Sequence, residues 1–171
     1  MSRTVVAAAR RLSAAVVLMA APIAVAQEMP TRRPGLWEVT MQVPNVPAQT
    51  VRQCIDARTD AQMLRIGQGT HAAQCTRNDF RKDGDRYVAE SECRVGESVA
   101  STRAVFTGDF SRSYRGEIDS RYAPPMAGVA RSRVTMSARW AGACPAGWKP
   151  GDMEMPGMGR MNVSELAPAR P

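Results

Sequence analysis

Apolar and polar residues alternate along most of the chain between residues 35 and 140, which is typical of β-strands with one buried face. The segments that show this are 35–43, 49–55, 98–110, 114–122 and 131–140. Short turns rich in Pro, Gly and Asn separate most of the runs, as in an antiparallel meander. We therefore expect a mainly β fold of about seven strands, curved or barrel-like.

One segment, residues 56–66, has the periodicity of an α-helix. Ala57, Ala61 and Leu64 recur at spacings of three and four, which gives the segment one apolar stripe. Asp56 is suited to cap its start and Gly67 to end it. A helix of this length suits a lid on a sheet edge or a barrel mouth.

A hairpin is predicted between Cys75 and Cys93, because the Asp83-Gly84 step stands between two strand-like runs. With a three-residue loop over 83–85, the two cysteines lie directly opposite each other. Opposed residues on antiparallel strands are close enough for a disulfide. The four cysteines then form two bridges, Cys75–Cys93 and Cys54–Cys144, whereas a zinc site lacks its usual spacing.

The expected inward faces carry many small residues, among them Ala, Gly and Ser, together with Met and few large aromatic residues. Small inward residues leave room inside a curved sheet. The pattern is compatible with an open barrel and equally with a filled two-layer sandwich.

The first 26 residues have the features of a secretory signal peptide. Arg3, Arg10 and Arg11 precede an apolar stretch that ends in Ala24-Val25-Ala26. That stretch is shorter than the roughly 20 residues of a membrane-spanning helix. The Arg10-Arg11 pair leaves a twin-arginine export route open. We expect a periplasmic or secreted protein, cleaved near Ala26, without a transmembrane anchor.

Composition divides the rest of the chain into three parts. We expect a mobile lead-in over 27–34, a single β-domain over 35–148 and a disordered tail rich in Met, Gly and Pro over 149–171. The formal net charge is +7, and three of these charges lie in the signal peptide. The remaining excess does not argue for nucleic acid, which an exported protein rarely meets.

Signals for catalysis are weak, and we expect a protein that is not an enzyme and has no catalytic residue or cofactor. His71 is the one histidine, and no nucleophile motif accompanies it. Glu90 and Glu92 share a strand face, but cross-strand pairing with arginine explains them better than an acid pair. A solvated charged surface likewise explains the outward arginines at 115, 121, 131, 133 and 139.

The segment DMEMPGMGRM is unusual in composition. Its four thioethers are soft ligands that suit Cu(I) in an exported protein. No histidine or cysteine supports them, and a plain disordered tail explains the composition better than a metal site does. The candidate metal ligands are Met153, Met155, Met158 and Met161.

Several short motifs together resemble a family of small exported bacterial proteins, domain of unknown function thirty-six-seventeen. The shared features are the RPGLWEV run from Arg33 to Val39, Gln53-Cys54-Ile55, Cys75, Cys93, Gly108-Asp109-Phe110, Tyr114-Arg115-Gly116 and Gly142-Ala143-Cys144. The resemblance covers residues 33–144 and implies no activity, cofactor or site residue. This chain departs from the family by placing its Met-rich segment after the last cysteine. A lesser likeness, Gly35-Leu36-Trp37, is to lipocalins, which hold apolar ligands in a closed eight-stranded cup.

The most economical hypothesis is a non-enzymatic exported β-domain that binds a small apolar ligand or a partner protein at the open end of its sheet. The alternatives are Cu(I) binding by the Met-rich tail and a lipocalin-like carrier.

Overall fold

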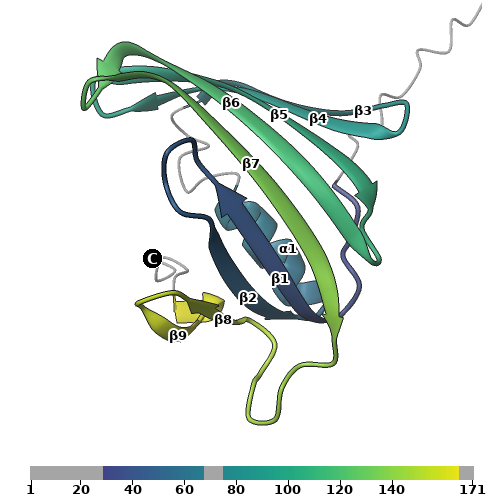
Figure 1. Ribbon diagram of the computed structural model, residues 1–171. Helices are drawn as coiled ribbons and strands as arrows, with labels where there is room; N and C mark the ends of the chain where they lie inside the picture. Colours follow the sequence, from purple (N-terminus) through teal and green to yellow (C-terminus); the bar gives the residue numbers. More distant parts are fainter. Residues whose placement is uncertain (1–28, 68–74, 166–171) are drawn as a thin grey trace, which may run out of the picture.

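The computed structural model describes residues 29–67 and 75–165, and it shows one antiparallel sheet of nine strands with a single α-helix (Figure 1). The fold class expected from the sequence is confirmed. The elements are β1 (Gly35–Gln42), β2 (Gln49–Ile55), α1 (Ala57–Gly67), β3 (Cys75–Asp83), β4 (Arg86–Val95), β5 (Ser98–Asp109), β6 (Ser113–Met126), β7 (Val129–Gly142), β8 (Asp152–Met155), β9 (Gly159–Asn162) and the short 3-10 helix η2 (Val163–Glu165).

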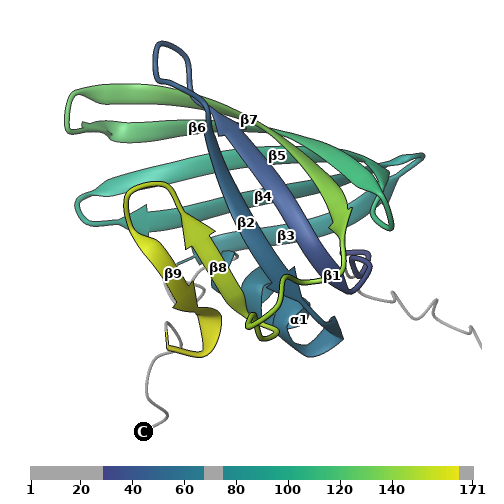
Figure 2. The same cartoon turned by 60° about the horizontal axis from the view of Figure 1, so that its bottom comes forward.

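The strand order across the sheet is β3-β4-β5-β6-β7-β1-β2-β8-β9. Strands β3 to β7 form a meander, and the sheet continues from β7 to β1. Strand β2 therefore lies between β1 and β8 and does not pair with β3. The sheet curves so that β3 to β7 arch over β1 and β2 (Figures 1 and 2). In the described part of the chain, β3 and β9 pair on one side only, so the closed cup of the lipocalin comparison is not formed.

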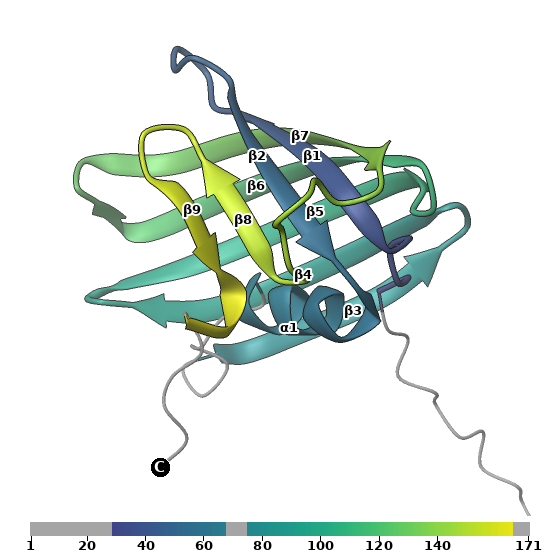
Figure 3. The ribbon, with the colours of Figure 1, turned by 90° about the horizontal axis from the view of Figure 1, so that it is seen from below.

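Helix α1 begins where the sequence places its cap. The backbone N–H of Thr59 donates to Oδ1 of Asp56 at 2.7 Å, and the Thr59 hydroxyl accepts from the N–H of Asp56 at 2.9 Å. These bonds satisfy backbone groups that a helix start otherwise leaves open. The helix lies on the concave side of the sheet, between the β2 side and the β3 side (Figure 3).

Both predicted disulfides, Cys54–Cys144 and Cys75–Cys93, are present. The hairpin register between Cys75 and Cys93 differs from the expectation, because Asp83 rather than Lys82 lies opposite Arg86. A bulge between Cys75 and Arg77 offsets this one-residue shift and returns the cysteines to opposition. The hairpin also lies at an edge of the sheet, not in the middle of the meander as expected.

Within the tail predicted to be disordered over 149–171, residues 152–162 instead continue the sheet as the hairpin β8–β9. The N–H of Gly151 donates to the Cys54 carbonyl at 2.8 Å, and Val163 is buried at 1% exposure. The tail therefore extends the β-domain beyond residue 148. The Gly/Pro content that suggested disorder makes tight turns here, and Met158 N–H closes one of them on the Met155 carbonyl at 3.1 Å.

The lead-in predicted to be mobile over 27–34 is anchored in its described part. Arg32 is buried at 7% exposure, and the carbonyls of Arg33 and Pro34 accept hydrogen bonds from the indoles of Trp37 and Trp140 at 2.8 and 3.0 Å. Three consecutive residues thus attach the segment to the sheet. The polar composition of this segment did not predict its attachment, because the contacts are made by backbone carbonyls and one buried arginine.

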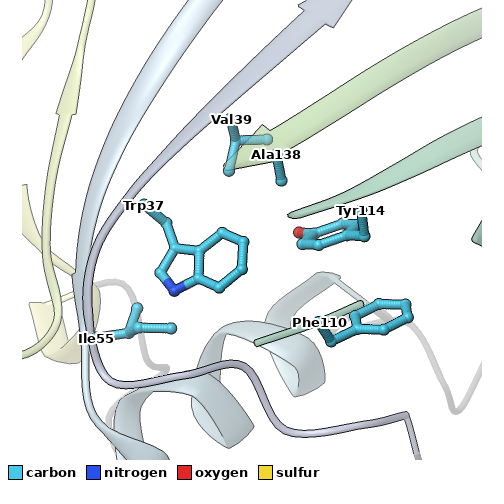
Figure 4. Close-up of a cluster of buried hydrophobic side chains, with 6 residues drawn as sticks. All are labelled: Trp37, Val39, Ile55, Phe110, Tyr114 and Ala138. Carbon is cyan, nitrogen blue, oxygen red and sulfur yellow. The ribbon is translucent and has the colours of Figure 1, made fainter. Parts of the chain in front are cut away.

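A compact cluster of buried side chains fills one end of the concave face, and it consists of Trp37, Val39, Ile55, Phe110, Tyr114 and Ala138 (Figure 4). Gly35 permits the entry of β1 beside this cluster. Its φ is 129°, and a Cβ there would lie 2.3 Å from the Gly142 carbonyl oxygen. Only glycine therefore fits at the start of β1.

Candidate functional site

A cavity of ≈ 430 Å³ lies on the concave side of the sheet, next to the buried cluster and beneath α1. This volume falls in the range of sites that bind small molecules. The residues that line it are Met29, Pro30, Arg32, Val39, Gln53, Met63, Leu64, Asn78, Phe80, Ala89, Ser91, Thr102, Ala104, Phe106, Phe110, Tyr114, Ile118 and Met136.

The cavity exists because strand alternation directs small residues to the concave face. Ala89 on β4 lies directly opposite Ala104 on β5, and Ala104 lies opposite Ile118 on β6. Two adjacent alanines leave the centre of the face without bulk. The expectation that small inward residues would leave room inside the curved sheet agrees with this arrangement.

A series of aromatic rings in contact lies beside the cavity, and Phe80, Phe110 and Tyr114 of this series line it. Phe110 stacks on Tyr114 with centroids 4.8 Å apart, and Tyr87 meets Phe110 edge-on at 5.4 Å. Tyr114 also contacts Trp37 at 5.8 Å, and Phe80 contacts Tyr87 at 5.9 Å. Such contacts hold large rings in fixed positions, so the wall keeps its shape.

A buried ion pair joins the lead-in to α1 at one end of the cavity. Arg32 Nε donates to Asp60 Oδ1 at 2.7 Å, and the Arg32 backbone N–H donates to Asp60 Oδ2 at 2.8 Å. Arg32 Nη1 also donates to Gln53 Oε1 at 3.0 Å. Asp60 is fully buried, and the pair compensates its charge where water does not reach it.

Tyr114 stands beside this ion pair with its ring against the buried cluster. Burial raises the pKa of the Tyr114 phenol, and the nearby Arg32 guanidinium opposes that shift. The phenol consequently remains neutral over the ordinary pH range. It supplies a polar group to an otherwise apolar wall without adding charge.

The outer face of the same strands carries charges that pair with one another. Glu90 accepts from Arg77 at 2.7 Å and from Arg81 at 3.3 Å, and Arg103 lies 3.6 Å away. The hydrogen bond from Arg81, with the attraction of the surrounding arginines, lowers the pKa of Glu90. Glu90 is therefore a carboxylate paired with arginines, as the sequence suggested.

Of the predicted outward arginines, Arg133 bonds Asp119 at 2.7 Å and Arg139 bonds Glu38. Arg121 and Arg131 lie opposite each other on β6 and β7 and line a groove of ≈ 810 Å³, which Ser120 and Ser132 also line. The groove also contains Glu90, Glu92 and Asp119, so its lining is of mixed sign.

The methionines considered as metal ligands lie on the β8–β9 hairpin. Met153 is opposite Met161, and Met155 is opposite Gly159, so three thioethers share one strand face. Met158 occupies the turn and is 66% exposed. Within the described residues, no group of three or more His, Cys, Asp and Glu side chains is placed to hold a metal ion. His71 and the predicted signal peptide lie outside the described residues.

Sequence reasoning missed Arg32 and Asp60. Both looked like ordinary surface charges, Arg32 in a polar lead-in and Asp60 in a helix with other polar residues. One available signal was position: Asp60 follows Ala57 by three residues and precedes Leu64 by four, on the apolar stripe. A carboxylate on such a stripe predicts a buried partner, although the stripe does not identify it.

Among the described residues, no helix is both long and apolar enough to cross a membrane. Comparison with curated proteins and with solved structures found no match. A family model, described as protein of unknown function (DUF3617), matches residues 32–144, which include strands β1 to β7, α1 and all four cysteines. The chain therefore belongs to the DUF3617 family, as the motifs in its sequence indicated.

Proposed function

We propose that the protein is an exported, non-enzymatic binding protein that takes a small apolar ligand into the cavity under α1. The observation that carries the proposal is the ≈ 430 Å³ cavity beside a fully packed cluster on the same face of one sheet. Ligand pockets are commonly apolar with a few placed polar groups. Asn78, Ser91 and Thr102 are such groups here.

The side chains around the cavity support binding rather than catalysis. Its one charged lining residue among those described is Arg32, and Asp60 already compensates that charge. A general acid or base needs a titratable group that can reach its substrate. Tyr114 is the remaining titratable side chain of the described lining, and its raised pKa keeps the phenol protonated, so it is not available to accept a proton. The two disulfides agree with an oxidising compartment outside the cytoplasm.

The direct test is to titrate the purified protein with an apolar fluorescent probe, after extracting any co-purified molecule with organic solvent and identifying it by mass spectrometry. Ala104→Phe places a ring in the cavity and should abolish probe binding. Val105→Phe is the matched control, since the next residue on β5 points to the outer face, and it should bind normally. If the probe fails to bind the parent protein, or binds both variants equally, the proposal is wrong. A protein partner would instead co-purify as a second chain.

The Met-rich hairpin supports a second candidate function, the binding of Cu(I). The observation in its favour is the register, which puts Met153, Met155 and Met161 on one face of β8–β9. Anaerobic calorimetric titration with Cu(I) should show one site in the parent protein. The double variant Met153→Leu/Met161→Leu should lose it, whereas Met158→Leu at the exposed turn should change the affinity less. Absence of heat with the parent protein would exclude this function.

A further inference from the structure

Side chains on the concave face are arranged in rows that run across the strands, and one row is polar throughout. Asn78, Ser91, Thr102, Ser120 and Ser132 are consecutive register partners from β3 to β7. The hydroxyls of Thr102 and Ser120 are hydrogen-bonded at 2.9 Å. We refer to these five residues as the polar row.

The next row toward the buried cluster is apolar throughout, and it consists of Phe80, Ala89, Ala104, Ile118 and Val134. The rows beyond it contain Tyr87, Phe106 and Met136, and then Tyr114 and Ala138. The part of the concave face that lines the cavity is thus polar at one end and apolar in the middle. The Arg32–Asp60 pair and Tyr114 mark its other end.

The cavity spans this sequence of rows, because its lining includes Thr102 at one end and Tyr114 at the other. The polar row and the Tyr114 row are six residues apart on β6, from Ser120 to Tyr114, or about 20 Å at the usual rise of a strand. A cavity of this length accommodates an extended hydrocarbon chain.

The chemistry of the two ends restricts the polar group of such a ligand. At the Arg32 end, the guanidinium already pairs with Asp60, so a second carboxylate would add an uncompensated buried charge. At the polar row, the lining groups Asn78, Ser91 and Thr102 are uncharged and can both donate and accept hydrogen bonds. An alcohol, an ester or an amide fits that row, and an ionised group does not.

We infer that the ligand is a single-chain amphiphile, whose extended hydrocarbon chain occupies the apolar rows and whose uncharged, hydrogen-bonding end group lies at the polar row. The inference rests on the proposed function, since it names the class of ligand for the same cavity. According to this inference, the cavity holds one hydrocarbon chain per protein, and that chain lies in one direction.

The test measures displacement of the apolar probe by unbranched alcohols of increasing length, by the fatty acid of one such length and by a sterol. Affinity should rise about fourfold per added methylene until the chain fills the cavity, and then level off. The alcohol should bind at least tenfold better than the ionised acid at pH 7, and the sterol should bind poorly. Thr102→Val, which removes one hydroxyl at nearly constant volume, should weaken the alcohol about fivefold.

Thr107→Val is the control for that substitution, because Thr107 lies on the outer face of the same strand and should leave the affinity unchanged. The corresponding alkane should bind the parent protein and Thr102→Val equally. If the probe binds but a sterol displaces it as well as an alcohol does, or the acid is preferred, the inference is wrong and the proposed function stands. If the probe does not bind, the proposed function itself fails.

Discussion

The two faces of strands β3 to β7 are built from alternate residues of the same segments, yet their side chains differ in charge and in their surroundings. On the outer face, Glu90 lies among Arg77, Arg81 and Arg103, and each charge has a neighbour of opposite sign in water. On the inner face, Ala89 and Ser91, which flank Glu90 in the sequence, line the cavity. Adjacent side chains on β4, such as Ala89 and Glu90, therefore have different surroundings: Ala89 lines the cavity, and Glu90 lies among solvated ion pairs.

The outer and inner faces differ in how completely their side chains contact one another. The outer charges compensate one another, and exposed ion pairs of this kind contribute little to the free energy of unfolding. The inner face combines a filled cluster at Trp37 with empty space at Ala104. Empty apolar space forgoes packing contacts that a filled core would have, so its occupant is the natural subject of experiment.

The largest expected effect comes from the buried charge on the inner side. Asp60→Ala leaves the Arg32 guanidinium buried without its partner, and unfolding in denaturant should show a loss of about 3–5 kcal/mol. The double variant Arg32→Met/Asp60→Leu replaces the pair by apolar groups and should recover most of that loss. If the single and the double variant are equally unstable, the loss reflects packing, and the ion pair does not organise this end of the cavity.

A second prediction separates the filled and the empty parts of the inner face with one substitution at two alanines. Ala138→Leu adds volume inside the buried cluster and should lower the free energy of unfolding by about 1–3 kcal/mol. Ala104→Leu adds the same volume at the cavity wall, so it should cost less than about 1 kcal/mol. Equal losses at both sites, measured by denaturant unfolding, would mean that the cavity is not available space.

A third prediction concerns the start of the helix that covers the cavity. Asp56→Ala removes the cap and should cost about 1 kcal/mol. The hydrogen bond from the Thr59 backbone lowers the pKa of Asp56, so the contribution of this carboxylate is present above its usual pKa of 3.8 and is lost as the pH falls through the lowered value. The difference between parent and variant should therefore shrink in acid. Asp56→Asn, which can still accept the bond, is the control.

Much of this fold follows from local patterns in the sequence. Alternation located the strands, and the Asp83-Gly84 step with the facing cysteines located a disulfide that the structure confirms. The register inside that hairpin was wrong by one residue, because a bulge next to Cys75 leaves no signal in an alternating pattern. Likewise, the Gly and Pro residues between 142 and 159 predict turns, but composition does not tell whether short strands pair between them.

The candidate site was harder to predict, because it depends on pairings far apart in the chain. Small inward residues suggested space, but the cavity also needs α1 to cover it and Arg32 to fix the lead-in. The polar row combines residues from five strands, and each looks unremarkable in its own segment. Its continuity depends on register, which a bulge or a turn of different length would change.

The smallest expected effect belongs to the outer face. Glu90→Gln removes a carboxylate that three arginines surround, but water screens all of these groups, so the denaturation midpoint at neutral pH should move only slightly. Because the Arg81 hydrogen bond lowers the pKa of Glu90, the small difference should be present above the usual pKa of 4.5 and vanish as the pH falls through the lowered value.

High salt should likewise remove the Glu90→Gln difference, whereas the loss from Asp60→Ala should persist, since salt screens exposed charges far more than buried ones. Glu92→Gln, on the same face of β4, serves as the control for charge alone. The affinity for an apolar probe should be the same in Glu90→Gln, Glu92→Gln and the parent protein. A change in probe affinity on substitution at Glu90 would mean that the two faces are coupled. Substitutions on the outer face would then affect binding at the inner face, contrary to this prediction.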